Sequence, residues 1–343
     1  MSVQHGVCDF GVDATTLTTI DTAYAQHTKA LGVGLVRLTV ETAPDGTMPT
    51  SLLRQVLDTY GQEGIEAHLE MTPAFMPTIA SVAASDHANM LLNTSGDTFI
   101  SPYIDKVTLR AEGVARQVRR SGAKVVIFWN EANELLLTPG QVVPAGGKGG
   151  ALSPLCAASL FWHGASRMQS VGCSVFNGAL SVLPQTGTNA ANPYYAHWLS
   201  SFYEDLAAHG KHAPFPWDGW AVNMEGVWSA QSFTLALHVL RGVMTTHGDT
   251  GSIRLTEWGW GAGPAVAQAD LDKTWAAINA SEVESATFFQ GPGQVPYTGF
   301  PELYKGKGAW MWTAKGRHYQ AGSDYTWGKM LRPKYASLAP SLV

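Results

Sequence analysis

The chain has 343 residues, of which 45% are hydrophobic and only 14% are charged, and its formal net charge at pH 7 is −5. That much apolar sequence supports a large core and excludes a disordered chain. Lysine and arginine do not cluster as they do in nucleic-acid-binding proteins, and no apolar run approaches the roughly 18 residues that a membrane helix needs. The three cysteines are odd in number and widely spaced, which excludes a disulfide framework and a clustered cysteine zinc site.

Short β-type runs alternate with longer segments of helical periodicity along the whole chain. The runs predict strands at residues 3–10, 35–41, 65–71, 124–130, 173–181, 218–225, 252–258 and 284–290. Between the strands lie segments whose helical spacing predicts helices, such as residues 50–62, 101–121, 152–171, 192–209, 232–247 and 264–280. Four of these helices end at a glycine that suits the left-handed conformation after a helix, namely Gly122, Gly172, Gly210 and Gly248.

Eight strand-then-helix units in one chain predict a (β/α)₈ barrel, and no change in composition marks a second domain, so we expect residues 1–343 to form one domain. The long connections, at 72–100, 131–151 and 291–316, all follow predicted strands. In such barrels the loops after the strands form the catalytic face. A doubly wound open sheet is the alternative, but the first strand is not followed by the Gly-x-Gly-x-x-Gly turn typical of that fold.

Two glutamates stand at the carboxyl ends of predicted strands. Glu131 follows the fourth strand in Trp129-Asn130-Glu131, and Glu257 ends the seventh in Thr256-Glu257-Trp258. Because strand ends meet at one mouth of a barrel, these carboxyl groups can face each other. Glycoside hydrolysis needs such a pair, one to protonate the leaving oxygen and one to attack or to activate water. The non-catalytic alternatives are that Glu131 caps the following helical turn and that Glu257 forms a salt bridge with a loop arginine.

This arrangement resembles the clan A retaining β-glycosidases, also called the 4/7 superfamily. The resemblance covers nearly the whole chain in strand order and rests on Trp129-Asn130-Glu131, on Thr256-Glu257-Trp258 and on Arg37 at the end of the second strand. It implies that Glu131 is the acid/base, that Asn130 binds the sugar 2-hydroxyl, that Glu257 is the nucleophile and that Arg37 lies beside it. The chain departs from the pattern after strand six, where Asn223-Met-Glu225 replaces a His-x-Tyr.

Electrostatics links these roles without reference to the clan. A guanidinium from Arg37 would favour the ionised form of Glu257, and the charge of Glu257 would favour protonation of Glu131. Once Glu257 becomes a glycosyl ester that charge is gone, so Glu131 ionises more readily and can act as the base for water. Glu134 is better explained as a loop or helix-start carboxylate than as the acid.

Further side chains on predicted strands are candidates for substrate binding. Glu70 and Glu225 end strands three and six, and either could bind sugar hydroxyls or replace one of the two glutamates in an inverting arrangement. His68 is as consistent with a core histidine as with a ligand-binding one. The remaining polar candidates are Asn177 and Asn223, and the aromatic platforms expected to stack on sugars are Trp258, Trp310 and Trp312.

The sequence thus predicts a retaining glycoside hydrolase without a cofactor or metal, acting on an oligosaccharide or polysaccharide. The histidines lack zinc-site spacing, and no Gly-x-Ser-x-Gly elbow is present. A carbohydrate-binding barrel without turnover and a transglycosylase with the same residues are the alternatives. The long loops favour a cleft and internal attack over a pocket for a terminal sugar. No leader is visible at the amino terminus, so we expect a cytoplasmic protein unless a leader has been removed, in which case it is secreted.

Overall fold

The structure is a computed structural model of the whole chain. It describes residues 3–12, 25–26, 28–29, 32–40, 50–71, 99–129, 132–133, 152–182, 194–225, 230–259, 268–288, 304–305, 311–313, 316–318, 323–324 and 333–334. All structural statements below concern these residues.

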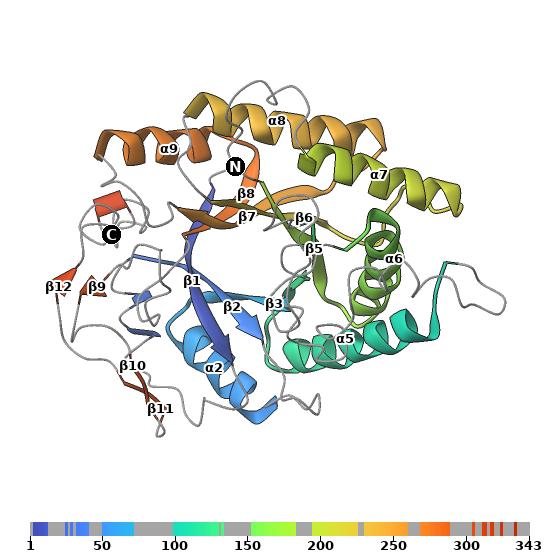
Figure 1. The fold of residues 1–343 in the computed structure, drawn as a ribbon. Coiled ribbons are helices and arrows are strands. Elements are labelled where there is room, and N and C mark those ends of the chain that lie inside the picture. Colours follow the sequence, from blue (N-terminus) through green and yellow to red (C-terminus); the bar gives the residue numbers. More distant parts are fainter. Residues whose placement is uncertain are drawn as a thin grey trace.

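Eight parallel strands form a closed barrel in chain order, with the last strand pairing with the first (Figure 1). The strands are β1 (Gln4–Val12), β2 (Leu35–Val40), β3 (Glu66–Met71), β4 (Val125–Phe128), β5 (Ser174–Ser181), β6 (Gly219–Glu225), β7 (Ser252–Gly259) and β8 (Val283–Phe288). The predicted (β/α)₈ barrel is therefore confirmed. Whether the chain forms one domain throughout stays a prediction.

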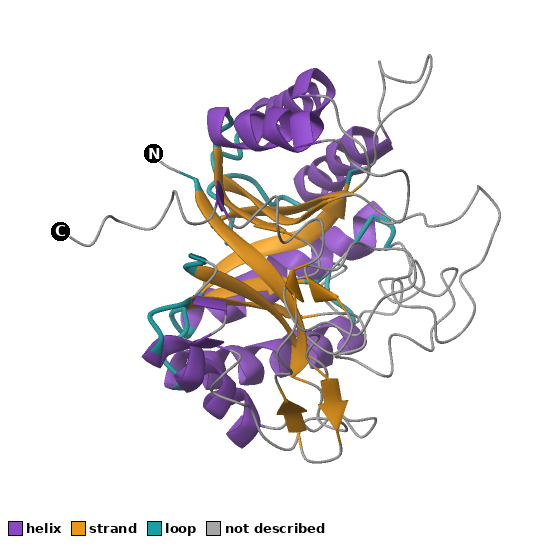
Figure 2. Cartoon of the chain, turned by 90° about the vertical axis from the view of Figure 1, so that its left-hand side faces the viewer, coloured by secondary structure: helices purple, strands orange, loops and turns teal. Residues whose placement is uncertain are grey.

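Helices surround the barrel as an outer layer, and the view turned by 90° shows the strands crossing between them (Figure 2). The helices are α2 (Thr50–Gln62), α5 (Pro102–Arg120), α6 (Pro154–Ser170), α7 (Tyr194–Ala208), α8 (Ala230–Thr246) and α9 (Gln268–Ala280). Two of them begin at a serine followed by proline, where the serine side chain accepts a hydrogen bond from a backbone N–H of the first turn. These caps are Ser101 of α5 and Ser153 of α6.

The predicted boundaries agree with the structure to within a few residues because hydrophobic periodicity and glycine stops both mark them. The glycines after α5, α6, α7 and α8 have φ values of 93°, 85°, 69° and 78°, as the left-handed stop requires. Within the predicted loop 291–316 the structure adds two short strands, β9 (Tyr304–Lys305) and β10 (Met311–Thr313), which pair with β12 (Ser323–Asp324) and β11 (Gly316–His318).

Alternation along the strands separates two apolar layers. On β4, Val126 and Phe128 belong to the large core between barrel and helices, whereas Val125 and Ile127 belong to a small separate cluster that fills part of the barrel interior. The other members of the inner cluster are Phe176, Ala179 and Ala221. Much of the remaining interior is polar, which departs from the branched aliphatic filling usual in such barrels.

Among the described helices, none combines the length and apolar character that crossing a membrane would require.

Candidate active site

One arginine joins two buried carboxylates inside the barrel. The Arg37 Nη1 atom donates to Glu70 Oε2 at 2.6 Å and to Glu257 Oε1 at 2.5 Å. These side chains are at most 3% exposed. Glu70 and Glu257 lie near the carboxyl ends of β3 and β7, but Arg37 is the third residue of β2 and not at its end as we expected. Its side chain is long enough to reach both carboxylates from that position.

A β-bulge in β7 turns Glu257 toward Arg37. The pairing between β6 and β7 advances from Val222–Leu255 to Asn223–Glu257, so Thr256 is an extra residue on β7. Arg254 faces the barrel interior, where it contacts His68, and strict alternation from there would point Glu257 outward. An extra residue resets the alternation, as bulges commonly do next to active sites.

Hydrogen bonds with side chains of three other strands hold the bulge. Thr256 Oγ1 donates to Asn223 Oδ1 on β6 at 2.8 Å. The carbonyl of Thr256 accepts from Cys8 Sγ on β1 at 3.2 Å and from the hydroxyl of Thr287 on β8. All four residues are buried. Asn223, a candidate for substrate binding, therefore contacts the bulge through its side-chain oxygen, while the roles of Thr256, Cys8 and Thr287 were not visible in the sequence pattern.

The same bulge moves Trp258 away from the barrel mouth. Its ring is 1% exposed and packs against Phe288, with centroids 5.0 Å apart, and against Trp275 of α9, with centroids 6.0 Å apart. When Glu257 turns inward, its neighbour must turn outward into the layer between barrel and helices. The expectation that Trp258 stacks on sugar is therefore corrected, because this ring is enclosed in the core.

The end of β4 has a strained backbone next to the predicted acid/base. Trp129, which follows β4 and is 1% exposed, has a φ of 76°, a left-handed conformation that costs a bulky residue about 1–3 kcal/mol. Its N–H donates to the carbonyl of Met71 on β3 at 3.1 Å, which extends the strand pairing by one residue. Asn130, Glu131 and Glu134 lie outside the described residues. Such outliers concentrate at functional sites, so this one agrees with the predicted importance of the turn.

Among the other predicted site residues, the structure describes the side chain of Asn177 but not those of Glu225, Trp310 and Trp312. Asn177 is fully buried, and within the described part of the chain neither side-chain atom has a hydrogen-bond partner. A buried amide of this kind is rare and usually meets water or a ligand. The side chains of Glu225 and Trp312 and the whole of Trp310 lie outside the described part.

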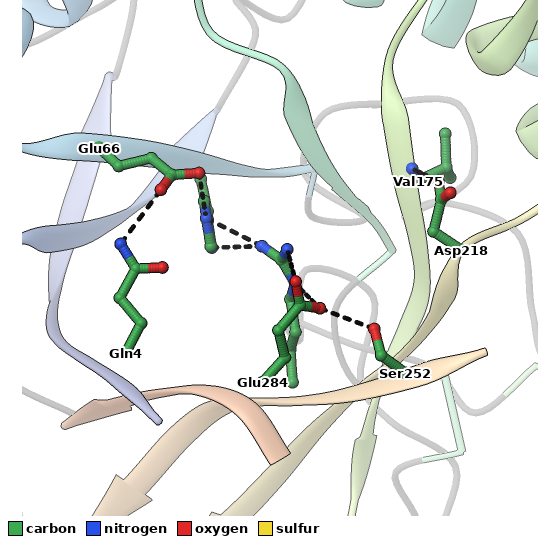
Figure 3. Close-up of polar contacts among 8 residues, drawn as sticks. Gln4, Glu66, Val175, Asp218, Ser252 and Glu284 are labelled. Atoms are coloured by element: carbon green, nitrogen blue, oxygen red, sulfur yellow. Dashed lines mark hydrogen bonds and ion pairs between the residues drawn. The ribbon is translucent and has the colours of Figure 1, made fainter. Parts of the chain in front are cut away.

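His68 lies in a second polar cluster, on the amino-terminal side of Arg37 and Glu257. Its ring contacts Glu66 Oε1 at 3.0 Å and Arg254 Nη1 at 2.9 Å. Arg254 also donates to Glu284 at 3.0 Å, and Ser252 donates to the same carboxylate at 2.7 Å. Figure 3 shows Glu66, Glu284 and Ser252 in these contacts, together with Gln4 at the start of β1. His68 therefore has the contacts of a core histidine and is not brought to Glu257.

The protonation of this cluster follows from burial and hydrogen bonding. Burial lowers the pKa of His68, so its ring is neutral at pH 7. A neutral ring with its proton on Nε2 donates to Glu66, and its Nδ1 accepts from Arg254 Nη1, which lies 3.2 Å from it. The hydrogen bond from His68 in turn lowers the pKa of Glu66 to about 2.

A cavity of about 500 Å³ opens at this amino-terminal side. It lies at the opposite end of the strands from Glu257, and its lining includes Phe215, Trp217, Asp218, Arg254 and Glu284. The charged groups already have partners within the protein: Arg254 bonds Glu284, and Asp218 accepts from the backbone N–H of Val175 at 2.8 Å. The cavity is therefore a poor place for the chemistry that the strand ends predict. Within the described residues, no group of three or more His, Cys, Asp or Glu side chains could hold a metal ion.

No protein-family model and no curated protein matches the sequence. Solved structures do match the fold. A complex of virulence factor SghA, a protein from Agrobacterium tumefaciens, with its substrate analogue salicin has a TM-score of 0.63 at 10% identity and covers 98% of this chain and 96% of its own. A β-glucosidase from Exiguobacterium marinum has a TM-score of 0.60 at 10% identity, covering 99% and 98%. A complex of XacCel5A with cellopentaose has a TM-score of 0.58 at 14% identity, covering 97% and 99%.

The chain has the fold of these proteins. At 10–14% identity the likeness concerns the fold alone, and it spans nearly the full length of both partners in each pair. The resemblance to the clan A β-glycosidases, which the Trp-Asn-Glu and Thr-Glu-Trp motifs suggested, thus holds for the architecture. The chemistry of the strand ends depends on this chain's own residues and does not follow from the fold.

Proposed function

We propose that the protein is a retaining β-glycoside hydrolase in which Glu257 is the nucleophile. The observation that carries the proposal is the buried Arg37–Glu257 pair, with Glu257 turned into the barrel by a bulge. A guanidinium nitrogen 2.5 Å from the carboxylate keeps it ionised and ready to attack. A salt bridge that served only stability would not require a β-bulge held by side chains of three other strands.

Glu131 is the acid/base of this proposal, and Asn130 binds the sugar 2-hydroxyl. Support comes from the strained, buried Trp129 directly before them and from their place after β4, three strands from β7 around the barrel. In the first step Glu257 attacks the anomeric carbon while Glu131 gives its proton to the departing oxygen. In the second step Glu131 takes a proton from water, and that water displaces Glu257 from the anomeric carbon.

Glu70 orients Arg37 in this scheme rather than acting as a catalytic acid. Its carboxylate is fully buried and lies 2.6 Å from the same Arg37 nitrogen that bonds Glu257. A carboxyl group held in an ion pair is a poor proton donor, which argues against the inverting arrangement. With two carboxylates on one guanidinium, rotation of Arg37 away from Glu257 would break both contacts. We likewise assign His68 to the structural cluster with Glu66 and Arg254.

The proposed substrate is an oligosaccharide or polysaccharide cleaved internally. Support comes from the three long post-strand connections of the sequence and from structural neighbours whose complexes hold salicin or cellopentaose. Glu225, Trp310 and Trp312 stay candidates for sugar contacts, as does Asn177. Product profiles over time test this part: early mixtures of oligosaccharides support a cleft, whereas release of only mono- or disaccharide would favour a pocket.

The mechanism is tested by a screen of aryl β-glycosides followed by proton NMR of the first product. Retention of the anomeric configuration is expected, and the opposite anomer would overturn the proposal. Replacing Glu131 by Ala should abolish hydrolysis of phenyl glycosides but spare the first step for dinitrophenyl glycosides, whose leaving group needs no proton. Azide should restore turnover of the variant. Equal loss on both substrates without azide rescue would assign the acid role to Glu225 or Glu70.

A further inference from the structure

The turn that carries Asn130 and Glu131 is attached to β5 by a side chain that the proposed mechanism does not use. The Nδ2 atom of Asn133 donates to the carbonyl of Ser181 at 3.0 Å, and the backbone N–H of Ser181 donates to Asn133 Oδ1 at 2.8 Å. Asn133 is 1% exposed. A flipped amide would oppose two donors and two acceptors, so the pair of bonds also fixes the orientation of the amide.

This amide replaces a missing stretch of strand. The pairing of β4 with β5 ends at Phe128 and Asn177, while β5 continues to Ser181. Beyond Asn177 the β5 edge would lack a partner on the β4 side. The amide of Asn133 pairs with the N–H and C=O of one residue, as a neighbouring strand does in an antiparallel ladder. Its side chain therefore ties the turn to the sheet where the backbone ladder has stopped.

The residue between Glu131 and Asn133 is held as well. Ala132 is fully buried, and its carbonyl accepts from the N–H of Leu152 at 2.8 Å. It packs on Gly178 of β5, where any added Cβ would come within 3.3 Å of the Ala132 methyl and 3.0 Å of Phe161. Gly178 has a φ of 48°, so glycine suits this position both for its conformation and for the close approach of the turn.

We propose that Asn133 is a positioning residue for Glu131. This inference rests on the proposed function and deepens it. Trp129 is fixed to Met71 before the acid/base, and Ala132 and Asn133 are fixed to Leu152 and Ser181 after it. Only Asn130 and Glu131 lie between these anchors, and two residues can span only a short distance. Both anchors are made of neutral groups, so they fix the turn without adding a charge that would oppose either protonation state of Glu131.

The test compares N133A with a control that loses a buried hydrogen bond elsewhere. Tyr203→Phe is that control, because the Tyr203 hydroxyl donates to Asp249 at 2.6 Å on the amino-terminal side of the barrel, at the other end from Asn133. For N133A, kcat/KM on the phenyl β-glycoside of the sugar that gives turnover should fall about 10- to 100-fold. On the 2,4-dinitrophenyl β-glycoside the change should stay within about 3-fold, because that leaving group needs no acid. Y203F should not discriminate between the two substrates.

A second readout does not depend on activity. Amide hydrogen exchange of the peptide spanning residues 129–133 should be faster in N133A and unchanged in Y203F. Equal losses on both glycosides, or exchange as slow as in the wild type, would overturn the positioning role. If E131A itself does not discriminate between the two glycosides, the acid/base assignment fails, and the exchange measurement still decides whether Asn133 holds the turn. The variant N133L, which keeps the approximate side-chain volume and removes both hydrogen bonds without adding a charge, provides the same test if N133A does not fold.

Discussion

The two ends of the barrel each hold an arginine between carboxylates, and they differ in how much water reaches those carboxylates. Near the carboxyl ends of the strands, Glu70 and Glu257 flank Arg37, and their side chains are 0% and 3% exposed. At the amino-terminal end, Glu66 and Glu284 lie beside Arg254 and His68, and their side chains are 49% and 45% exposed. The residue types are nearly the same, but one cluster is dry and the other is solvated.

That difference separates a reactive arrangement from a structural one. Among the described side chains, two dry carboxylates share a single guanidinium, and burial makes such charges expensive. Such an arrangement is expected where the charge is used in chemistry. Carboxylates that reach water lose little hydration free energy on folding, and their ion pairs add little to stability, as is usual for exposed salt bridges. Ion pairing alone therefore does not distinguish the two ends of this barrel, whereas burial of both acids does.

The largest expected effect contrasts one glutamate from each end. Replacing Glu257 by Gln keeps the volume but removes the nucleophile, so kcat/KM should fall by about 10⁴-fold or more. Replacing Glu284 by Gln keeps a hydrogen-bond acceptor for Arg254 and should leave kcat/KM within about 3-fold of wild type. Steady-state kinetics on one aryl glycoside checks both. Comparable losses in the two variants would show that the ends are not functionally distinct.

The next effect is on stability. Replacing Arg37 by Met leaves two buried carboxylates without their cation and should lower the free energy of unfolding by about 3–5 kcal/mol. Replacing Arg254 by Met should cost only about 1–2 kcal/mol, because Glu66 and Glu284 can be solvated instead, although the contact of Arg254 with the Phe176 ring is lost. Urea unfolding at pH 7 and 25 °C measures both values.

The double variant R37M/E70Q sharpens this comparison. Neutralising Glu70 removes one of the two uncompensated charges, so part of the stability lost in R37M should return. No recovery in the double variant would mean that Glu70 is not destabilised by the loss of Arg37, and burial of the carboxylates would then be the wrong explanation for the difference between the two ends.

The barrel was predictable because its signals are local. Alternating and apolar runs marked the strands, and a glycine marked the end of each of α5, α6, α7 and α8. The place of Glu257 near the end of a strand was also accessible from the sequence, but its inward direction depends on the bulge at Thr256. Prediction of the contact between Arg37 and Glu257 also needed the resemblance to clan A, because neither segment carries a signal that it lies beside the other.

The missed features depend on contacts between distant segments. The bulge at Thr256 is defined by its register against β6, and no residue type announces it, so the sequence did not show that Trp258 turns into the core. Asn133 carries no distinguishing signal in the sequence, because its contact depends on Ser181 lying opposite its amide. For His68 the sequence left a ligand-binding role and a core role open, and only the three-dimensional position of Arg254 distinguishes them.

The smallest expected effect is a pH dependence at the amino-terminal cluster. The hydrogen bond from His68 is the largest cause that lowers the pKa of Glu66, to about 2 from 4.5, and the contacts with Gln4 and Arg254 act in the same direction. Since the folded-state pKa is depressed, the stabilisation by Glu66 is present above pH 4.5 and is lost as the pH falls toward 2. Because the side chain is about half exposed, we expect the stabilisation by Glu66 to be less than about 1 kcal/mol.

Replacing Glu66 by Gln keeps an acceptor for His68 and removes only the charge. The difference in unfolding free energy between wild type and E66Q, measured in urea, should therefore be constant from pH 7 to pH 5 and should shrink between pH 4.5 and pH 2.5. A difference that persists unchanged at pH 2.5 would mean that the charge of Glu66 contributes nothing, and that the amino-terminal cluster is held by neutral hydrogen bonds and packing alone.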